Sequence, residues 1–181
     1  MIGETFIVLF RGVGGATQLP TKPLREALTE AGFRSVATYI ASGNVVLASG
    51  LSADEVKARV AAIVGKKLGF SKSIFVVTRQ EWGDFIAQNP FPEAVDRPTT
   101  LHAFALEAEP SREAVQALAA RAAASERVVV KGKVLYFHAP EGFGTSKLPP
   151  IIDRTLEVAT TARNWNTVLK LGELARTAAS R

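Results

Sequence analysis

The sequence predicts an α+β protein built from two tandem ferredoxin-like (split βαβ) subdomains with mostly antiparallel sheets. Strand-like apolar segments and amphipathic helical segments follow one another in the order β-α-β-β-α-β, which is the split βαβ motif. A second series of similar order follows within the 181 residues, a length that accommodates two small domains. We expect the first subdomain, with an extra helix, at residues 1–92, and the second, ending in a helix, at residues 99–181.

The elements of the first half have recognisable start and stop signals. Ser52-x-x-Glu55 and Thr78-x-x-Glu81 predict helix starts, because in such capping boxes the two side chains satisfy free backbone N–H groups. Gly32 predicts the end of the first helix. We expect strands at residues 5–10, 36–40, 45–48 and 73–77, and helices from Thr21 to Gly32, from Ser52 to near Gly69, and from Thr78 to Asn89.

The second half shows a similar series with little residue identity to the first. Its hairpin is marked by Lys131-Gly132-Lys133 between two strands of apolar residues. We expect strands at residues 100–106, 127–130, 134–138 and 159–162, and helices at 111–124, 150–158 and 164–178. The phenylalanines of the expected strands lie among apolar neighbours and predict core positions rather than an RNA-binding platform: Phe6, Phe75, Phe104 and Phe137.

The composition excludes several classes of chemistry. Cysteine is absent, which excludes disulfides, thiolate metal sites and cysteine nucleophiles. The sequence has two histidines. No metal-ligand spacing and no serine–histidine–carboxylate set is recognisable, so we expect no metal ion and no cofactor, and we assign no catalytic residue. No targeting or membrane-spanning segment is evident, and we expect a cytoplasmic protein without membrane contact.

The net charge of +5 lies entirely in the last 55 residues, since the first 126 residues are balanced. A basic excess of this kind favours phosphates, nucleic acid or acidic small molecules as partners. A solvated surface that keeps the protein soluble explains the same excess. Charge alone therefore does not decide between a binding site and an ordinary surface.

Five short strings of the sequence resemble those of a widespread family of bacterial proteins, the domain of unknown function 1697 family. They occur in the family's order over nearly the whole chain, at residues 9–12, 39–46, 89–92, 144–148 and 161–170. The resemblance implies two ferredoxin-like subdomains in tandem, and it implies no activity, cofactor or partner. The chain departs from the family at the glycine-rich loop that follows Arg11, which is shorter here and lacks the family's asparagine and lysine.

Seven residues within these strings are candidates for binding an anionic group, each with a structural alternative. Ser146 and Lys147 offer a hydroxyl and a positive charge near a helix start, or form a plain cap with a solvated lysine. Arg163, Asn164 and Asn166 form a dense polar cluster that binds a ligand or locks the fold, with Asn164 capping the last helix. The remaining two candidates lie in the first half: Arg11 and Asn44.

The two histidines are expected at one sheet edge. In the split βαβ order the first and third strands are antiparallel neighbours, which brings His102 and His138 to the same end. Proton transfer there is conceivable, although surface histidines explain the pattern more simply. If the protein is an enzyme, His138 or Asp153 would have to supply the general base.

The sequence thus predicts a binding protein for an anionic, phosphate-bearing small molecule or nucleotide, held in a basic cleft between the subdomains. An enzyme acting on a phosphorylated substrate, a nucleic-acid-binding protein and a structural or interaction protein are the alternatives. Nucleic acid is the less favoured partner, because no RNA-binding signature is present. The oligomeric state is not predicted.

Overall fold

A computed structural model describes residues 3–180 and divides the chain into two compact units. The first unit contains the residues up to Asp84 together with those from Lys170 onward, and the second contains Phe85–Leu169. The expected subdomains, residues 1–92 and 99–181, divide the chain differently, because they assign the entire last helix to the second half.

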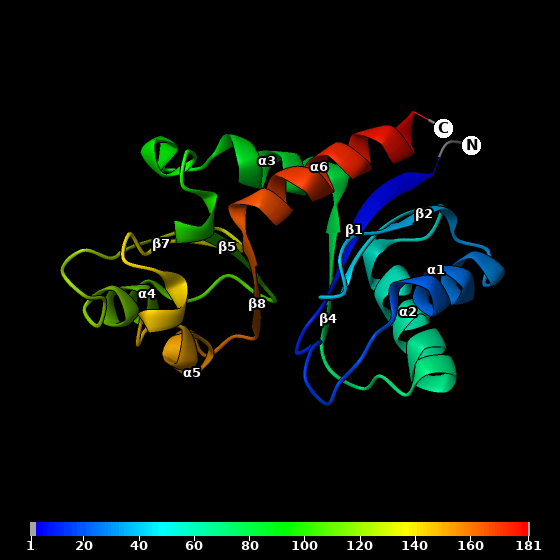
Figure 1. The fold of residues 1–181 in the computed structure, drawn as a ribbon, viewed down its shortest axis with the longest axis horizontal. Helices are drawn as coiled ribbons and strands as arrows, with labels where there is room; N and C mark the ends of the chain where they lie inside the picture. The colour runs from blue at the N-terminus through cyan, green and yellow to red at the C-terminus, as the bar shows by residue number, and fades with distance from the viewer. Residues whose placement is uncertain (1–2, 181) are drawn as a thin grey trace. The chain divides into compact units, whose positions relative to one another are not determined.

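The first unit contains a four-stranded antiparallel sheet in the order β2-β3-β1-β4. Helices α1 and α2 lie side by side against this sheet (Figure 1). Their apolar faces, including Leu28 of α1 and Val60 of α2, are buried against Phe6 and Val8 of β1. The bounds of these elements are β1 Glu4–Phe10, α1 Thr21–Glu30, β2 Arg34–Thr38, β3 Asn44–Ser49, α2 Ala53–Leu68 and β4 Ile74–Thr78.

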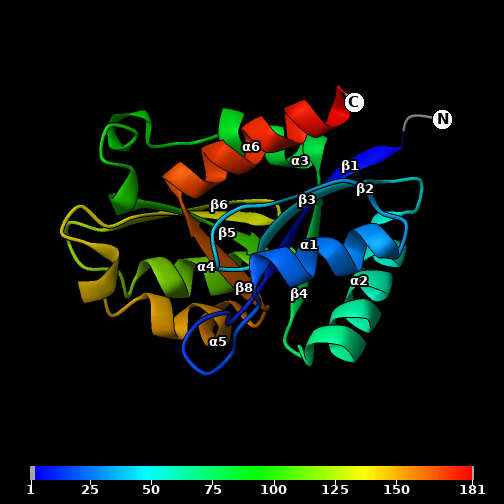
Figure 2. The same cartoon turned by 45° about the vertical axis from the view of Figure 1, so that its right-hand side comes forward.

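The second unit repeats this topology, since its sheet has the order β6-β7-β5-β8 and every neighbouring pair is antiparallel. Helices α4 and α5 pack together against one face of the sheet (Figure 2), where Leu118 and Ile152 meet Phe104 and Phe137. The elements are β5 Leu101–Leu106, α4 Arg112–Ala119, β6 Arg127–Lys131, β7 Val134–His138, α5 Ile152–Leu156 and β8 Thr160–Asn164.

The remaining helices connect or extend the units. Helix α3, Arg79–Ala87, follows β4, and helix α6, Trp165–Ala179, follows β8; each contributes residues to both units. Short 3-10 turns occupy four further positions: Pro92–Ala94, Pro98–Thr100, Phe143–Thr145 and Pro149–Ile151. The α+β class and the doubled ferredoxin-like order predicted from the sequence are therefore confirmed.

The observed elements differ from the expected ones mainly at their ends. Strand β2 begins and ends two residues early. It begins at Arg34 because Arg34 pairs with Ala48 of β3, with an irregularity at Ser35 (φ 49°) before the pairing resumes at Ala37. It ends at Thr38, two residues before Ile40 (φ 48°), whose backbone is not extended. Helix α4 ends at Ala119 rather than at residue 124, and the next turn is closed by Glu126, whose carboxylate accepts the N–H of Ala123 at 2.9 Å.

The four strand phenylalanines are buried, as expected from their apolar neighbours. Both capping boxes also form: Ser52 exchanges hydrogen bonds with Glu55 before α2, and Thr78 does so with Glu81 before α3. Among residues 3–180, no helix combines the length and the apolar character that a membrane crossing requires.

Candidate functional site

Asn44 has a structural task in the first unit. Its buried side-chain amide donates to the carbonyl of Tyr39 at 3.1 Å and to the hydroxyl of Ser42 at 3.0 Å, which closes the turn between β2 and β3. The neighbouring Gly43 has a φ of +78°, and a Cβ there would lie 2.8 Å from the Cβ of Phe10. This part of the 39–46 string therefore specifies a tight turn.

The glycine-rich loop after β1 is a compact turn in which several backbone groups are already paired. Gly14 and Thr17 exchange two backbone hydrogen bonds of 2.7 and 3.0 Å, and the N–H of Arg11 donates to the carbonyl of Ser73 at 3.0 Å. The ammonium of Lys72 donates to the carbonyl of Gly12 at 3.1 Å. Arg11 is half-buried beside this loop and belongs to the first unit.

The polar cluster at the junction of β8 and α6 separates into three different environments. The Asn164 carbonyl oxygen Oδ1 accepts the N–H of Thr167 at 3.0 Å, so Asn164 caps α6 as expected. The buried Arg163 donates to the Thr161 hydroxyl at 2.8 Å and to the Ala162 carbonyl at 2.7 Å, and burial lowers the pKa of Arg163 to about 10. Asn166, by contrast, is exposed.

Ser146 and Lys147 lie on a segment that is held at both ends by apolar side chains. Phe143 packs on the ring of His102, with centroids 3.9 Å apart, and Leu148 is buried. Between them, the Ser146 hydroxyl accepts the N–H of Leu148 at 3.1 Å. The next helical turn begins at Pro149, with Leu148 at its N-cap position and no side-chain cap. Ser146 therefore closes a local turn and does not cap a helix, and exposed Lys147 follows it.

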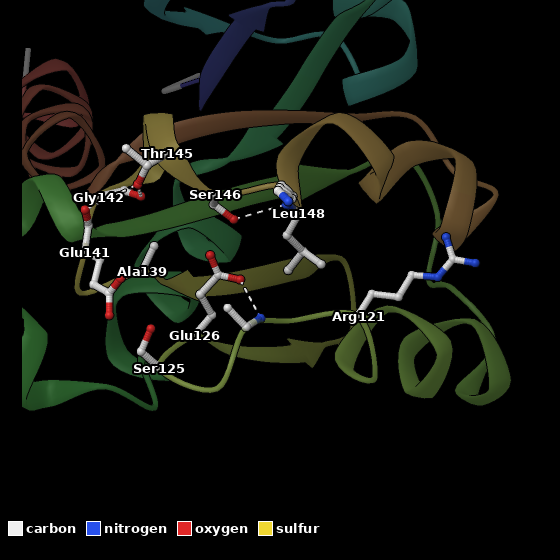
Figure 3. A pocket seen from close by; sticks show the side chains of 11 residues that line it. Arg121, Ser125, Glu126, Ala139, Glu141, Gly142, Thr145, Ser146 and Leu148 are labelled. Carbon is white, nitrogen blue, oxygen red and sulfur yellow. Dashed lines mark hydrogen bonds between the residues drawn. The ribbon is translucent and has the colours of Figure 1, made fainter.

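This segment forms one wall of a pocket of about 310 Å³ that lies wholly within the second unit. The opposite wall comes from the turns after α4, and a further part comes from the chain that leaves β7 (Figure 3). Of the seven candidate residues, the pocket brings together Ser146 and Lys147. It is lined by Arg121, Ala123, Ser125, Glu126, Ala139, Glu141, Gly142, Thr145, Ser146, Lys147 and Leu148.

The pocket contains cations that no carboxylate neutralises. Arg121 and Lys147 are both exposed, and neither forms an ion pair or side-chain hydrogen bond within residues 3–180. Three hydroxyls, from Ser125, Thr145 and Ser146, line the same hollow. The arrangement offers cationic donors and neutral donors to a single small ligand, which is the combination that phosphate oxygens accept.

The lining residues Arg121, Ser125 and Glu126 were not identified from the sequence. They follow the alanine-rich helix α4, and nothing in their spacing relates them to Ser146. Only the packing of α4 against α5 and the sheet brings the end of α4 to the end of β7. An isolated arginine within the alanine run of residues 119–124 was the single local signal.

The histidines occupy the same end of the β5–β7 pair, as expected, because Leu101 pairs with His138 and His102 pairs with Phe137. The interpretation as a surface residue was wrong for His138, whereas His102 is half-buried. His138 is buried and its Nδ1 lies 3.4 Å from Nη2 of Arg127, so this nitrogen is the acceptor. Burial and the Arg127 charge lower the pKa of His138, against a smaller opposing effect of Glu93.

His102 is half-buried and stacks on Phe143, and its buried Nδ1 lacks a hydrogen-bond partner within the part of the chain that is described. Burial lowers its pKa to about 4. Asp153, the other candidate base, accepts the Thr160 hydroxyl at 2.6 Å. The lining of the pocket includes neither of the two histidines, and it does not include Asp153. Among residues 3–180, no three histidine, aspartate or glutamate side chains are grouped so that they could share a metal ion.

Comparisons with known proteins agree with the fold. A conserved bacterial protein, SP0830 from Streptococcus pneumoniae, has a similar structure with a TM-score of 0.70 and 20% sequence identity, over 95% of this chain and 98% of the other. No curated protein matches the sequence. The family described as protein of unknown function (DUF1697) matches residues 4–136. Because this match spans well over half of the sequence, the chain belongs to the DUF1697 family.

Proposed function

We propose that the protein binds a small phosphate-bearing molecule in the pocket of the second unit. The observation that carries the proposal is the pair of unneutralised cations, Arg121 and Lys147, on the lining of one hollow. Neither side chain is held by an internal partner, so both remain available to an external anion. Binding the anion then has to offset the rotamer freedom that an exposed arginine or lysine loses when it is ordered.

The hydroxyls of the pocket support the same class of ligand. Ser146 uses its oxygen as an acceptor from Leu148, and its hydroxyl hydrogen remains a donor for a phosphate oxygen. Ser125 contributes a further hydroxyl to the lining, whereas the Thr145 hydroxyl already donates to the carbonyl of Gly142 at 3.1 Å. A phosphate group has several acceptor oxygens, so it can accept from the cations and the hydroxyls together.

The pocket favours a small molecule over a nucleic-acid strand. Its volume of about 310 Å³ is at the lower end of the range for ligand pockets. A strand-binding surface would present aromatic rings from the sheet for base stacking, whereas Phe104 and Phe137 of the second sheet are buried in the core.

The proposal is tested by calorimetric titration of the full-length protein with ribose 5-phosphate. We expect saturable binding by the unmodified protein. The affinity should be about tenfold lower in each of the single variants Lys147→Ala and Arg121→Ala, since a charge-assisted hydrogen bond contributes about 1.5 kcal/mol. The matched control is Lys133→Ala, which removes another exposed lysine, from the β6–β7 turn outside the pocket. Equal weakening by Lys133→Ala, or absence of saturable binding, contradicts the proposal.

Salt dependence separates a single phosphate from a polymer. A ligand with one phosphate should lose less than about tenfold in affinity between 50 and 200 mM NaCl, whereas six to ten phosphate contacts would lose about 1,000-fold or more. A steep slope with single-stranded oligonucleotides, together with no binding of ribose 5-phosphate, would replace the small-molecule proposal with nucleic-acid binding.

A further inference from the structure

The pocket carries charges of both signs that do not neutralise one another. Alongside Arg121 and Lys147, its lining includes Glu126 and Glu141. Within residues 3–180 none of these four side chains forms an ion pair. A phosphate would compensate the two cations and would at the same time face two uncompensated carboxylates, which repel it. A ligand with phosphate alone therefore uses only part of this site.

The Glu126 carboxylate is held in place by its own turn. One of its oxygens accepts the N–H of Ala123 at 2.9 Å, and the Glu126 N–H donates to the Ala123 carbonyl, also at 2.9 Å. Figure 3 shows the carboxylate pointing toward Ser146. A carboxylate fixed in this way presents its remaining lone pairs to the hollow with little further loss of conformational entropy.

Glu141 provides the second carboxylate, from the chain that leaves β7. It is exposed, and its carboxylate makes no hydrogen bond to any residue that the structure describes. Figure 3 places Glu141 beside Gly142 and Thr145 and places Glu126 in the middle of the pocket, below Ser146. Arg121 lies at the far end, and its guanidinium extends away from the other labelled side chains. The carboxylate of Glu141 and the guanidinium of Arg121 therefore belong to opposite ends of the lining, with the carboxylate of Glu126 between them.

The rest of the lining excludes a stacking platform for a nucleobase. None of the eleven lining residues is aromatic, and the apolar part consists of two alanines and Leu148. The uncharged polar side chains of the lining are the hydroxyls of Ser125, Thr145 and Ser146. Together with the volume of about 310 Å³, this lining fits a compact aliphatic ligand with several polar groups.

We infer that the ligand is a small phosphate ester that also carries a primary ammonium group, as an amino sugar phosphate does. Its phosphate contacts Lys147 and, once the exposed Arg121 side chain turns toward the hollow, Arg121 as well. Its ammonium donates to the carboxylates of Glu126 and Glu141. This inference rests on the proposed function, because it assumes that the phosphate binds in this pocket. The ammonium satisfies the carboxylates that a plain sugar phosphate would leave facing its own negative charge.

The experiment compares glucosamine 6-phosphate with glucose 6-phosphate, which differ by one amino group in place of a hydroxyl. Calorimetric titration of the full-length protein at pH 7 should show about tenfold tighter binding of glucosamine 6-phosphate. Glu141→Gln should abolish most of this preference while glucose 6-phosphate binds at least as tightly as before, because a repulsive charge is removed. Lys147→Ala should weaken both sugars by the same factor and keep their ratio.

Glu126→Gln is the second variant, and its amide oxygen can still accept the Ala123 N–H, so the turn is kept. Thermal melting of each variant verifies that it is folded. Equal binding of the two sugars by the unmodified protein, or a preference that persists in both glutamate variants, overturns the ammonium inference and leaves phosphate binding intact. If neither sugar phosphate and no ribose 5-phosphate binds, the proposed function and this inference both fail.

Discussion

At the scale of single residues, Ile40 has a backbone conformation that its side chain disfavours. Its φ of 48° is left-handed, and a β-branched residue in this region is strained by steric contact of its Cβ substituents. The side chain is 50% exposed, so its burial returns little stabilisation. The neighbouring turn, closed by Asn44, imposes the conformation on Ile40.

We therefore expect Ile40→Gly to stabilise the protein by about 1 kcal/mol, because glycine adopts the left-handed region without strain. Urea denaturation should show a higher midpoint with an unchanged slope. The control is Thr38→Gly in β2, where the backbone φ is negative and glycine should destabilise. Equal destabilisation by both substitutions would show that Ile40 is not strained.

His102 makes the stability of the fold dependent on pH. Burial lowers its pKa to about 4, whereas an unfolded chain has a histidine pKa near 6.5. The unfolded state consequently binds the proton more readily, so the contribution of neutral His102 is complete above pH 6.5 and is lost as the pH falls from there toward 4. His138, whose pKa is also lowered, acts in the same direction.

We expect the free energy of unfolding to fall by about 2 kcal/mol between pH 7 and pH 5 through His102 alone. Urea denaturation at several pH values measures this slope. His102→Phe keeps an aromatic ring against Phe143 and removes the titrating group, so its slope should be clearly smaller. An identical slope in this variant would show that protonation of His102 does not limit stability.

At the scale of secondary-structure elements, the start of α6 separates a structural asparagine from an exposed one. Asn164 accepts the N–H of Thr167, and loss of such a cap costs about 1 kcal/mol. Asn164→Ala should therefore lower the free energy of unfolding by about that amount, measured by urea denaturation. Asn166→Ala, two positions along in the exposed part of the same helix, should change stability by less than about 0.5 kcal/mol.

A large loss of stability in Asn166→Ala would mean that this asparagine holds structure that its exposure does not reveal.

The prediction that Asn164 caps the last helix was correct because capping is a local interaction between residues three positions apart. The expected start of β2 was wrong because Arg34 pairs with Ala48 of β3 across an irregularity at the left-handed Ser35. The sequence has no signal for this irregularity, since serine is not a residue that demands a left-handed conformation.

At the scale of the whole molecule, the doubled strand order could be predicted because each half carries its own alternation of strand and helix signals. The pocket could be predicted only on one side. Ser146 and Lys147 belong to a recognisable string, whereas Arg121 and Glu126 reach the pocket through the packing of α4. The order of strands placed the two histidines at one end of a strand pair, whereas nothing in the order or spacing of residues shows that the end of α4 meets the end of β7.

The division of the chain also has a consequence for its synthesis. The second unit is one continuous stretch, Phe85–Leu169, and it is inserted between the two parts of the first unit. A ribosome that builds the chain from its amino end therefore releases all residues of the pocket-bearing unit before the residues from Lys170 onward that complete the other. During translation, the unit that is begun first is the one whose sequence is completed last.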